Sequence, residues 1–245
     1  MRFLRELLAA VQFLTCVPVP SYKFEPEMAA GAAKFYPIVG ALVGLGAMAL
    51  HWSLRAHLPA GVIAIAVLVY FGLITGGMHE DGLADTVDGL GAGGGRERML
   101  AIMRDSRIGS FGTLAIVSSV LFRWALVAAM EPSKFGPYVL VAQVLSRWTV
   151  LPLSAFMSSA RIDGLGEKLA RKVSMASLAL GSAFALTIAG FTLRTHMVAP
   201  VAAAAAVALF SGILYRAKLG GITGDCMGAS IQISEIAVYL CAVWV

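Results

Sequence analysis

Long apolar segments recur along the whole chain, and no other feature of the sequence limits its fold as strictly. Residues 175–193, for example, read MASLALGSAFALTIAGFTL, a run without any charged residue. A helix needs about 20 mostly apolar residues to cross the hydrocarbon core of a bilayer. The chain is 59% hydrophobic and only 13% charged, which is about half the charged share of a soluble domain. We therefore predict an all-α fold, a polytopic membrane helical bundle that forms a single domain over residues 1–245.

We expect about seven membrane spans, with six or eight as the alternatives. Pro59 marks a tight turn between the first two, so these two resemble a hairpin. The last span is short, and Glu235 is expected at a shallow depth within it. The expected spans are residues 35–57, 59–78, 112–130, 136–159, 175–193, 198–215 and 230–245.

The first 20 residues form a different kind of segment. Apolar side chains recur there at helical spacing, and Glu6 and Gln12 interrupt the apolar run. No small-residue cleavage site follows, which disfavours a cleaved signal peptide. We predict that residues 1–20 form an amphipathic helix at the membrane interface.

The distribution of basic residues predicts the orientation of the bundle. With the N-terminus in the cytoplasm, only Arg55, Lys134 and Arg194 fall in the external connections, and most of the 19 lysines and arginines are cytoplasmic. This is the bias that membrane proteins normally show. It accounts for the net charge of +5 without a nucleic-acid partner. The acidic loop over residues 79–111 is then also cytoplasmic, and we expect the chemistry there.

The three cysteines, Cys16, Cys226 and Cys241, are far apart in the sequence. No Cys/His spacing typical of zinc is present, and an odd, scattered set does not predict a disulfide framework.

The loop opens with the sequence HEDGLADTVDG, residues 79–89. On a helix, Asp81, Asp85 and Asp88 lie at positions i, i+4 and i+7, so they share one face. Like charges at this spacing destabilise a helix unless a cation compensates them. Carboxylate oxygens suit a hard cation such as Mg²⁺, which takes one or two carboxylates together with substrate phosphate. The alternative is a solvated acidic face with no ligand.

Two further polar stretches are candidates for the site. In MRDSRIGSFG, residues 103–112, the Arg107 guanidinium could contact a phosphate, or it could only anchor the chain at the membrane interface. In GGITGDCMGASIQISE, residues 220–235, Asp225 is either a functional acid or the N-cap of the following helix.

Two arginines fall deep inside expected spans. Arg123 and Arg147 each lie about 16 Å along a helix from its end, near the middle of the membrane. Such residues are functional suspects. They could line a pocket for an anionic substrate, or they could pair with Glu235.

At family level, HEDGLADTVDG resembles the H-x-D-G-x-x-D-x-x-D-G signature of the cobalamin-5′-phosphate synthases, also called adenosylcobinamide-GDP ribazoletransferases. FLTCVPVP (13–20), FYPIVGALVG (35–44), RERMLAIMRDSRIGSFG (96–112), SRW (146–148) and GGITGDCMGA (220–229) agree as well. The resemblance therefore covers nearly the whole chain. Glu80 falls at an unconstrained position of the signature.

The resemblance implies a bacterial multi-pass enzyme of the cytoplasmic (inner) membrane. It would join adenosylcobinamide-GDP to α-ribazole, or to its 5′-phosphate, and release GMP with Mg²⁺ as cofactor. Asp81, Asp85 and Asp88 would hold the metal, with Asp88 as the candidate general base. The expected substrate contacts are His79, Asp105, Ser106, Arg107 and Asp225. The expected partners are these small molecules and the lipid bilayer, with no nucleic acid; a homo-oligomer is compatible with the sequence.

Two alternatives remain at the level of sequence. CDP-alcohol phosphotransferases and polyprenyl transferases also use aspartate-rich helices and Mg²⁺. The first motif requires an arginine that is missing after Asp81-Gly82, and the second requires another aspartate-rich motif that is absent. A cation transporter would instead place its acids in mid-membrane, whereas these acids gather at the expected cytoplasmic boundary.

Overall fold

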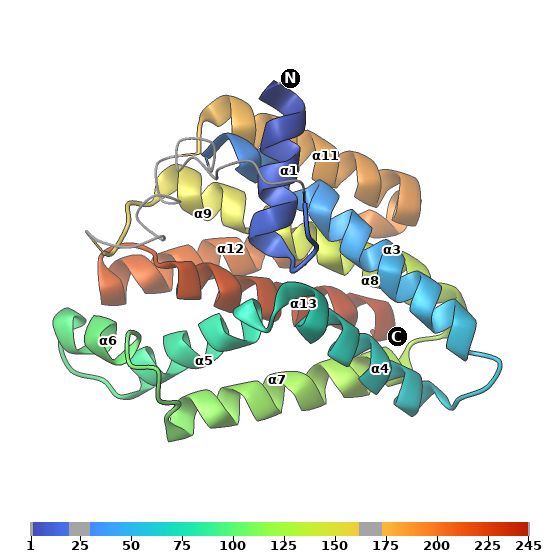
Figure 1. Ribbon diagram of the computed structural model, residues 1–245, viewed down its shortest axis with the longest axis horizontal. Helices are drawn as coiled ribbons and strands as arrows, with labels where there is room; N and C mark the ends of the chain where they lie inside the picture. The colour runs from blue at the N-terminus through green and yellow to red at the C-terminus, as the bar shows by residue number, and fades with distance from the viewer. Residues whose placement is uncertain (1, 20–29, 162–172, 245) are drawn as a thin grey trace.

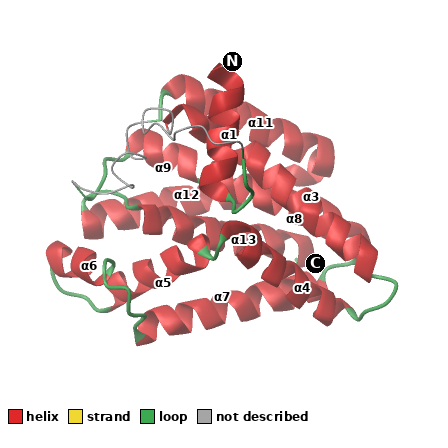
Figure 2. Ribbon diagram, viewed as in Figure 1, coloured by secondary structure: helices red, strands yellow, loops and turns green. Residues whose placement is uncertain are grey.

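The computed structural model describes residues 2–19, 30–161 and 173–244. Within these ranges the chain forms helices and no strand (Figure 2), which confirms the all-α prediction. The only β-type pairing among them is an isolated parallel bridge between Ser159 and Ile222. The helices are α1 (Arg2–Leu14), η1 (Ala33–Phe35), α3 (Tyr36–Leu54), α4 (Ala60–Thr75), α5 (Met78–Gly91), α6 (Arg96–Ile102), α7 (Ser110–Ala129), α8 (Pro132–Trp148), α9 (Val150–Phe156), α11 (Met175–Leu193), η2 (Arg194–Met197), α12 (Val198–Leu219) and α13 (Gly224–Val243).

Several of these helices are long and apolar enough to cross a membrane. In the described part of the chain there are five such stretches, or up to six if one bent helix pair is counted as a span. One of the five, Met175–Leu219, contains α11, η2 and α12. A multi-pass membrane protein is therefore supported, but the expected number of seven spans is not confirmed.

The second expected span does not continue to residue 78, because α4 stops at Thr75 and the chain turns by 88° into α5. Gly76 and Gly77 have φ angles of 65° and 70°, a left-handed backbone conformation that residues other than glycine rarely adopt. The Gly77 N–H donates to the Gly72 carbonyl at 2.8 Å and closes the helix end. The start of the expected loop over residues 79–111 is thus a helix inside the bundle.

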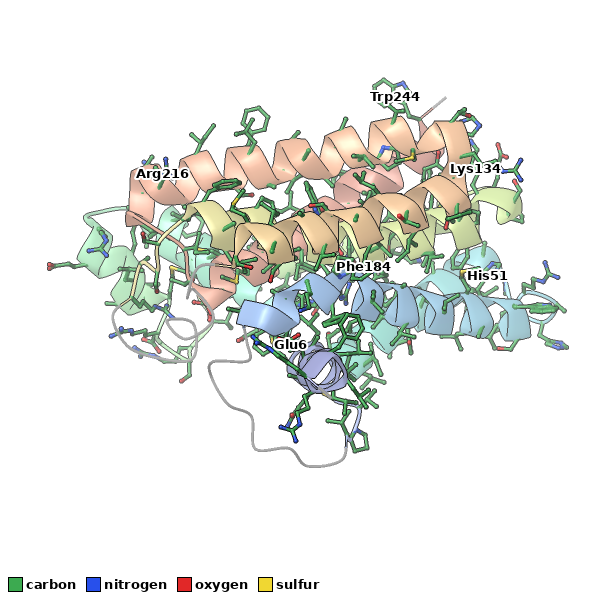
Figure 3. All side chains as sticks on the ribbon, turned by 90° about the horizontal axis from the view of Figure 1, so that it is seen from above. Glu6, His51, Lys134, Phe184, Arg216 and Trp244 are labelled. Atoms are coloured by element: carbon green, nitrogen blue, oxygen red, sulfur yellow. The ribbon has the colours of Figure 1, made fainter. Side chains whose placement is uncertain are left out.

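The acidic helix α5 packs between α13 and α7 (Figure 1), while α3 packs on α8 at the other side of the molecule. Figure 3 shows Arg216 at one end of the long helices and Lys134 at the other. These two residues were expected on opposite sides of the membrane. The arrangement agrees with that expectation, although which side is cytoplasmic stays a prediction.

Helix α1 runs across the long helices and is seen end-on in Figure 3. Its buried Glu6 accepts a hydrogen bond from Lys34 Nζ at 2.7 Å and from Arg2 Nε at 3.1 Å. This ion pair ties the amphipathic helix to the start of the first long apolar stretch. A helix in the first 20 residues is as predicted; its place at a membrane interface stays a prediction.

The last helix is longer than expected, because it begins before residue 230. The Thr223 side chain accepts a hydrogen bond from the Cys226 N–H at 3.2 Å, so α13 starts at Gly224. Glu235 consequently lies in the middle of α13 and is buried; the shallow depth that the sequence predicted for it in the membrane stays a prediction. The same bond gives the capping role to Thr223, which leaves the Asp225 carboxylate for other contacts.

Candidate active site

The acidic face of α5 forms one wall of the candidate site. Asp81, Asp85 and Asp88 lie on the same helix and follow each other by one turn, as the spacing predicted. Their burial increases along the helix: Asp81 is exposed, Asp85 half-buried and Asp88 buried. The three carboxylates therefore meet different surroundings, although they share one face.

The first turn of α13 forms the opposite wall. A methyl group placed on Gly82 would lie 2.8 Å from the Asp225 carbonyl oxygen and 3.3 Å from Gly228 Cα. Only the absence of a side chain at Gly82 lets the two helices approach so closely. As a result, Asp225 is an electrostatic neighbour of both Asp81 and Asp85. The structure thus brings together acids that are far apart in the sequence.

Asp88 has a separate structural role at the far end of this face. Its two carboxylate oxygens accept the backbone N–H groups of Gly109, at 2.7 Å, and Gly112, at 2.8 Å. These are N–H groups at the start of α7, where a helix has no internal acceptors and where a negative charge is favourable. Asp88 therefore fastens α5 to the N-terminus of α7.

Arg161 is a site residue that the sequence analysis did not single out. Its Nη2 lies 3.0 Å from Asp225 Oδ2, and it is also an electrostatic neighbour of Asp85. Nη2 donates a second hydrogen bond to the Met103 carbonyl at 3.3 Å. The sequence held no motif for it, since Arg161 enters the site from the end of a distant segment.

The other expected substrate contacts are placed differently. Asp105, Ser106 and Arg107 belong to the connection between α6 and α7, and Arg107 pairs with Asp105, with Nη2 and Oδ2 2.7 Å apart. The hydrogen bonds from the Arg107 side chain and backbone lower the pKa of Asp105 to about 2. Arg107 is largely exposed. Among the described residues, its side-chain hydrogen bonds go to Asp105 and not to the acids of α5.

His79 is buried on the side of α5 that faces α13. Its Cα would lie 3.3 Å from a methyl group placed on Gly228, and its Nε2 has no hydrogen-bond partner in the structure. A buried nitrogen without a partner is costly, so His79 Nε2 is available to a further group.

The carboxylate oxygens of the acidic surface are the type of ligand that a hard cation prefers. Asp81, Asp85 and Asp225 supply only oxygen atoms, and the neighbouring Cys226 is buried, with its Sγ accepting a hydrogen bond from Thr223 Oγ1 at 3.4 Å. Among the described residues, no three His, Cys, Asp or Glu side chains are close enough to form a complete metal cage. Magnesium in proteins is usually held by one or two carboxylates, with waters and substrate phosphates completing its shell. The residues present fit that mode of binding better than an all-protein cage.

Comparison with known proteins shows the family of the chain. The family model described as cobalamin-5-phosphate synthase matches residues 6–243. The chain belongs to the cobalamin-5-phosphate synthase family. The match includes both walls of the site. It disfavours the alternatives of another membrane transferase or a cation transporter, which the sequence analysis had left open.

Several curated relatives of this family are similar over nearly their full length. The adenosylcobinamide-GDP ribazoletransferase of Xanthobacter autotrophicus is 38% identical, over 98% of this chain and 96% of the relative. The protein of the same name from Bradyrhizobium diazoefficiens is 37% identical, over 97% and 92%. That from Polaromonas sp. is 34% identical, over 98% and 96%. No solved structure matches the chain.

Proposed function

We propose that this member of the cobalamin-5-phosphate synthase family is an adenosylcobinamide-GDP ribazoletransferase that works on the acidic face of α5. The single observation that carries the proposal is the contact of Gly82 with Asp225. It gathers Asp81, Asp85 and Asp225 from two helices into one acidic surface. A dense negative surface next to a cation, Arg161, suits a reaction in which charged phosphates are bound and moved.

In the proposed reaction, a hydroxyl oxygen of α-ribazole, or of its 5′-phosphate, attacks the phosphorus that carries the cobinamide. A new O–P bond forms, and the bond between this phosphorus and the bridging oxygen of the pyrophosphate breaks. GMP leaves with that oxygen, and the hydroxyl proton passes to a base. The product is adenosylcobalamin or its 5′-phosphate.

Asp81 and Asp85 are the proposed Mg²⁺ ligands, with Asp225 completing the site or orienting the substrate. The bound metal would neutralise the pyrophosphate and the charge that develops on the leaving phosphate. Asp81 and Asp85 suit this role because their side chains are more exposed than that of Asp88.

The remaining residues receive roles from their contacts. Arg161 binds a pyrophosphate oxygen after leaving Asp225, and His79 Nε2 binds a substrate group. Arg107 contacts phosphate only if it releases Asp105. Both oxygens of Asp88 already accept hydrogen bonds from backbone N–H groups at the start of α7. Asp88 therefore holds α7 in place, and Asp85 or Asp81 is the better candidate for the base.

The localisation and the partners follow from the same proposal. The acidic face is placed at the cytoplasmic side of a bacterial inner membrane, where nucleotide-linked substrates are available. The lipid bilayer surrounds the long helices, many of whose large apolar side chains are exposed in the isolated chain. Whether the chain forms homo-oligomers stays a prediction.

The test is GMP release by purified protein from adenosylcobinamide-GDP and α-ribazole, with and without Mg²⁺. We expect Asp85→Asn to reduce kcat/KM by roughly 100-fold or more and Arg161→Met to raise KM for adenosylcobinamide-GDP. The matched control is Glu131→Gln at the opposite end of the bundle, where the side chain is exposed. Full Mg²⁺-dependent activity in Asp85→Asn would refute the metal assignment, and full activity without any divalent cation would refute the metal altogether.

A further inference from the structure

Beneath the acidic face, four charged side chains from four helices meet in the interior of the bundle. They are Glu80 of α5, Arg123 of α7, Arg147 of α8 and Glu235 of α13. The side chains of Arg123, Arg147 and Glu235 are at most 2% exposed, and that of Glu80 is 21% exposed. Charges buried to this degree are retained only when they are paired, because removing them from water is costly.

The positive and negative charges of this cluster are equal in number, and Arg123 contacts both glutamates. Arg123 Nη2 lies 3.1 Å from Glu80 Oε1, and Arg123 Nη1 lies 3.3 Å from Glu235 Oε2. Arg147 Nη1 lies 3.9 Å from the other oxygen of Glu235. Two positive and two negative charges thus balance, and Arg123 joins α5 to α13 across α7. This is the pairing alternative that the sequence had left open for the two arginines.

A neutral side chain provides a second link from Glu80 to α13. Gln232 Nε2 donates to Glu80 Oε1 at 2.9 Å, and Ser119 Oγ donates to Gln232 Oε1 at 3.2 Å. Glu80 Oε1 therefore accepts from both α7 and α13. The other oxygen, Oε2, is buried without a hydrogen-bond partner.

The position of Glu80 in the chain gives these contacts a consequence for the site. Glu80 directly precedes Asp81, and it lies in the first turn of α5, just after the bend at Gly76 and Gly77. The chain bends by 88° there, so α5 does not continue the direction of α4 and needs contacts with other helices to hold it in place. The far end of α5 is fastened by Asp88. The near end is held by the packing of His79 and Gly82 against α13 and by the polar contacts of Glu80.

We propose that Glu80, Arg123 and Gln232 are positioning residues that hold the first turn of α5, and with it Asp81 and Asp85, at a fixed distance from Asp225. The inference rests on the proposed function, since it assigns the same acids to the metal and the pyrophosphate. Glu80 is assigned to neither of them, because its Oε1 is directed to Arg123 and Gln232 and its Oε2 is buried beneath the acidic face. A small displacement of reacting groups costs an enzyme much of its rate. The activity therefore depends on these buried contacts, although they do not touch the substrate.

Glu80→Gln and Gln232→Met test the proposal. Glu80→Gln retains an acceptor oxygen for both donors but removes the charge. Gln232→Met removes a hydrogen bond without changing any charge, so it separates positioning from a direct electrostatic effect on the cation. Glu131→Gln is the matched control, because Glu131 also pairs with a basic residue, Lys134, but lies at the outer end and is exposed. For each variant, the Mg²⁺ concentration for half-maximal GMP release, kcat and the melting temperature in detergent are measured.

We expect Glu80→Gln and Gln232→Met to raise the half-maximal Mg²⁺ concentration by roughly tenfold or more and to lower kcat, while Glu131→Gln changes neither. A melting temperature that falls with an unchanged Mg²⁺ requirement and kcat in the folded fraction would show a purely structural role and overturn the proposal. A shift in Glu80→Gln with none in Gln232→Met would also overturn it, in favour of a direct charge effect. If the unsubstituted protein needs no divalent cation, the metal site fails, and the kcat of the same variants still decides the positioning role.

Discussion

The close contact between α5 and α13 makes a quantitative prediction for Gly82→Ala. The new methyl group would lie 2.8 Å from the Asp225 carbonyl oxygen and 3.1 Å from Asp225 Cα. Both atoms belong to the backbone of α13, so no side chain can rotate away. Non-bonded atoms prefer separations near 3.5 Å or more, and the two helices must therefore move apart by roughly half an ångström.

Two terms of opposite sign set the change in stability. Overpacking at a tight contact lowers the stability by about 1–3 kcal/mol. Replacing glycine by alanine inside a helix raises the stability by about 0.5–1 kcal/mol. We expect Gly82→Ala to lower the free energy of unfolding by about 1 kcal/mol on balance. Gly72→Ala in α4 is the matched control, since its methyl group would meet nothing within 4 Å. It should raise the free energy of unfolding by about 0.5–1 kcal/mol.

Thermal or denaturant unfolding in detergent, together with GMP release, separates the two effects. Gly82→Ala should remain folded but lose most of its activity, because Asp81 and Asp85 are displaced from Asp225. Gly72→Ala should keep full activity. Equal stability and equal activity in the two variants would show that the contact of Gly82 does not set the geometry of the site.

Two further predictions concern the contacts of Asp88, which hold the end of α5, and the contacts of Glu6, which hold α1. Asp88→Ala leaves two N–H groups of Gly109 and Gly112 without their acceptor, so the free energy of unfolding should fall by about 1–3 kcal/mol per group; a melting temperature equal to that of the unsubstituted protein would contradict the cap. Burial raises the pKa of Glu6, but the hydrogen bonds and charges of Lys34 and Arg2 outweigh it and lower the pKa below its usual 4.5. The stabilisation is therefore complete above that value and is lost as the pH falls below it. Melting curves at a series of acidic pH values should show a steeper loss for the unsubstituted protein than for Glu6→Gln, and parallel losses would refute the role of the pair.

The candidate site was predicted in part by its local spacing. The positions of Asp81, Asp85 and Asp88 on one helical face follow from the period of the α-helix, which any helical segment obeys. The capping role of Asp88 and the entry of Arg161 were not predictable in this way. Each depends on a partner more than 20 residues away in the sequence, and no local pattern encodes which distant segments meet.

The sequence by itself determined the class of the protein, because a chain with such long apolar runs is stable only as helices that satisfy their own backbone in a membrane. It also determined the helical face that carries the acids. Only the tertiary structure decided that α4 breaks at Gly76 and Gly77, that Gly82 admits Asp225 to the acidic face, and that Arg123 joins Glu80 to Glu235. The physical reason is that a buried charge and a close backbone contact are stable only with a specific partner in space, and that partner is set by how the helices pack.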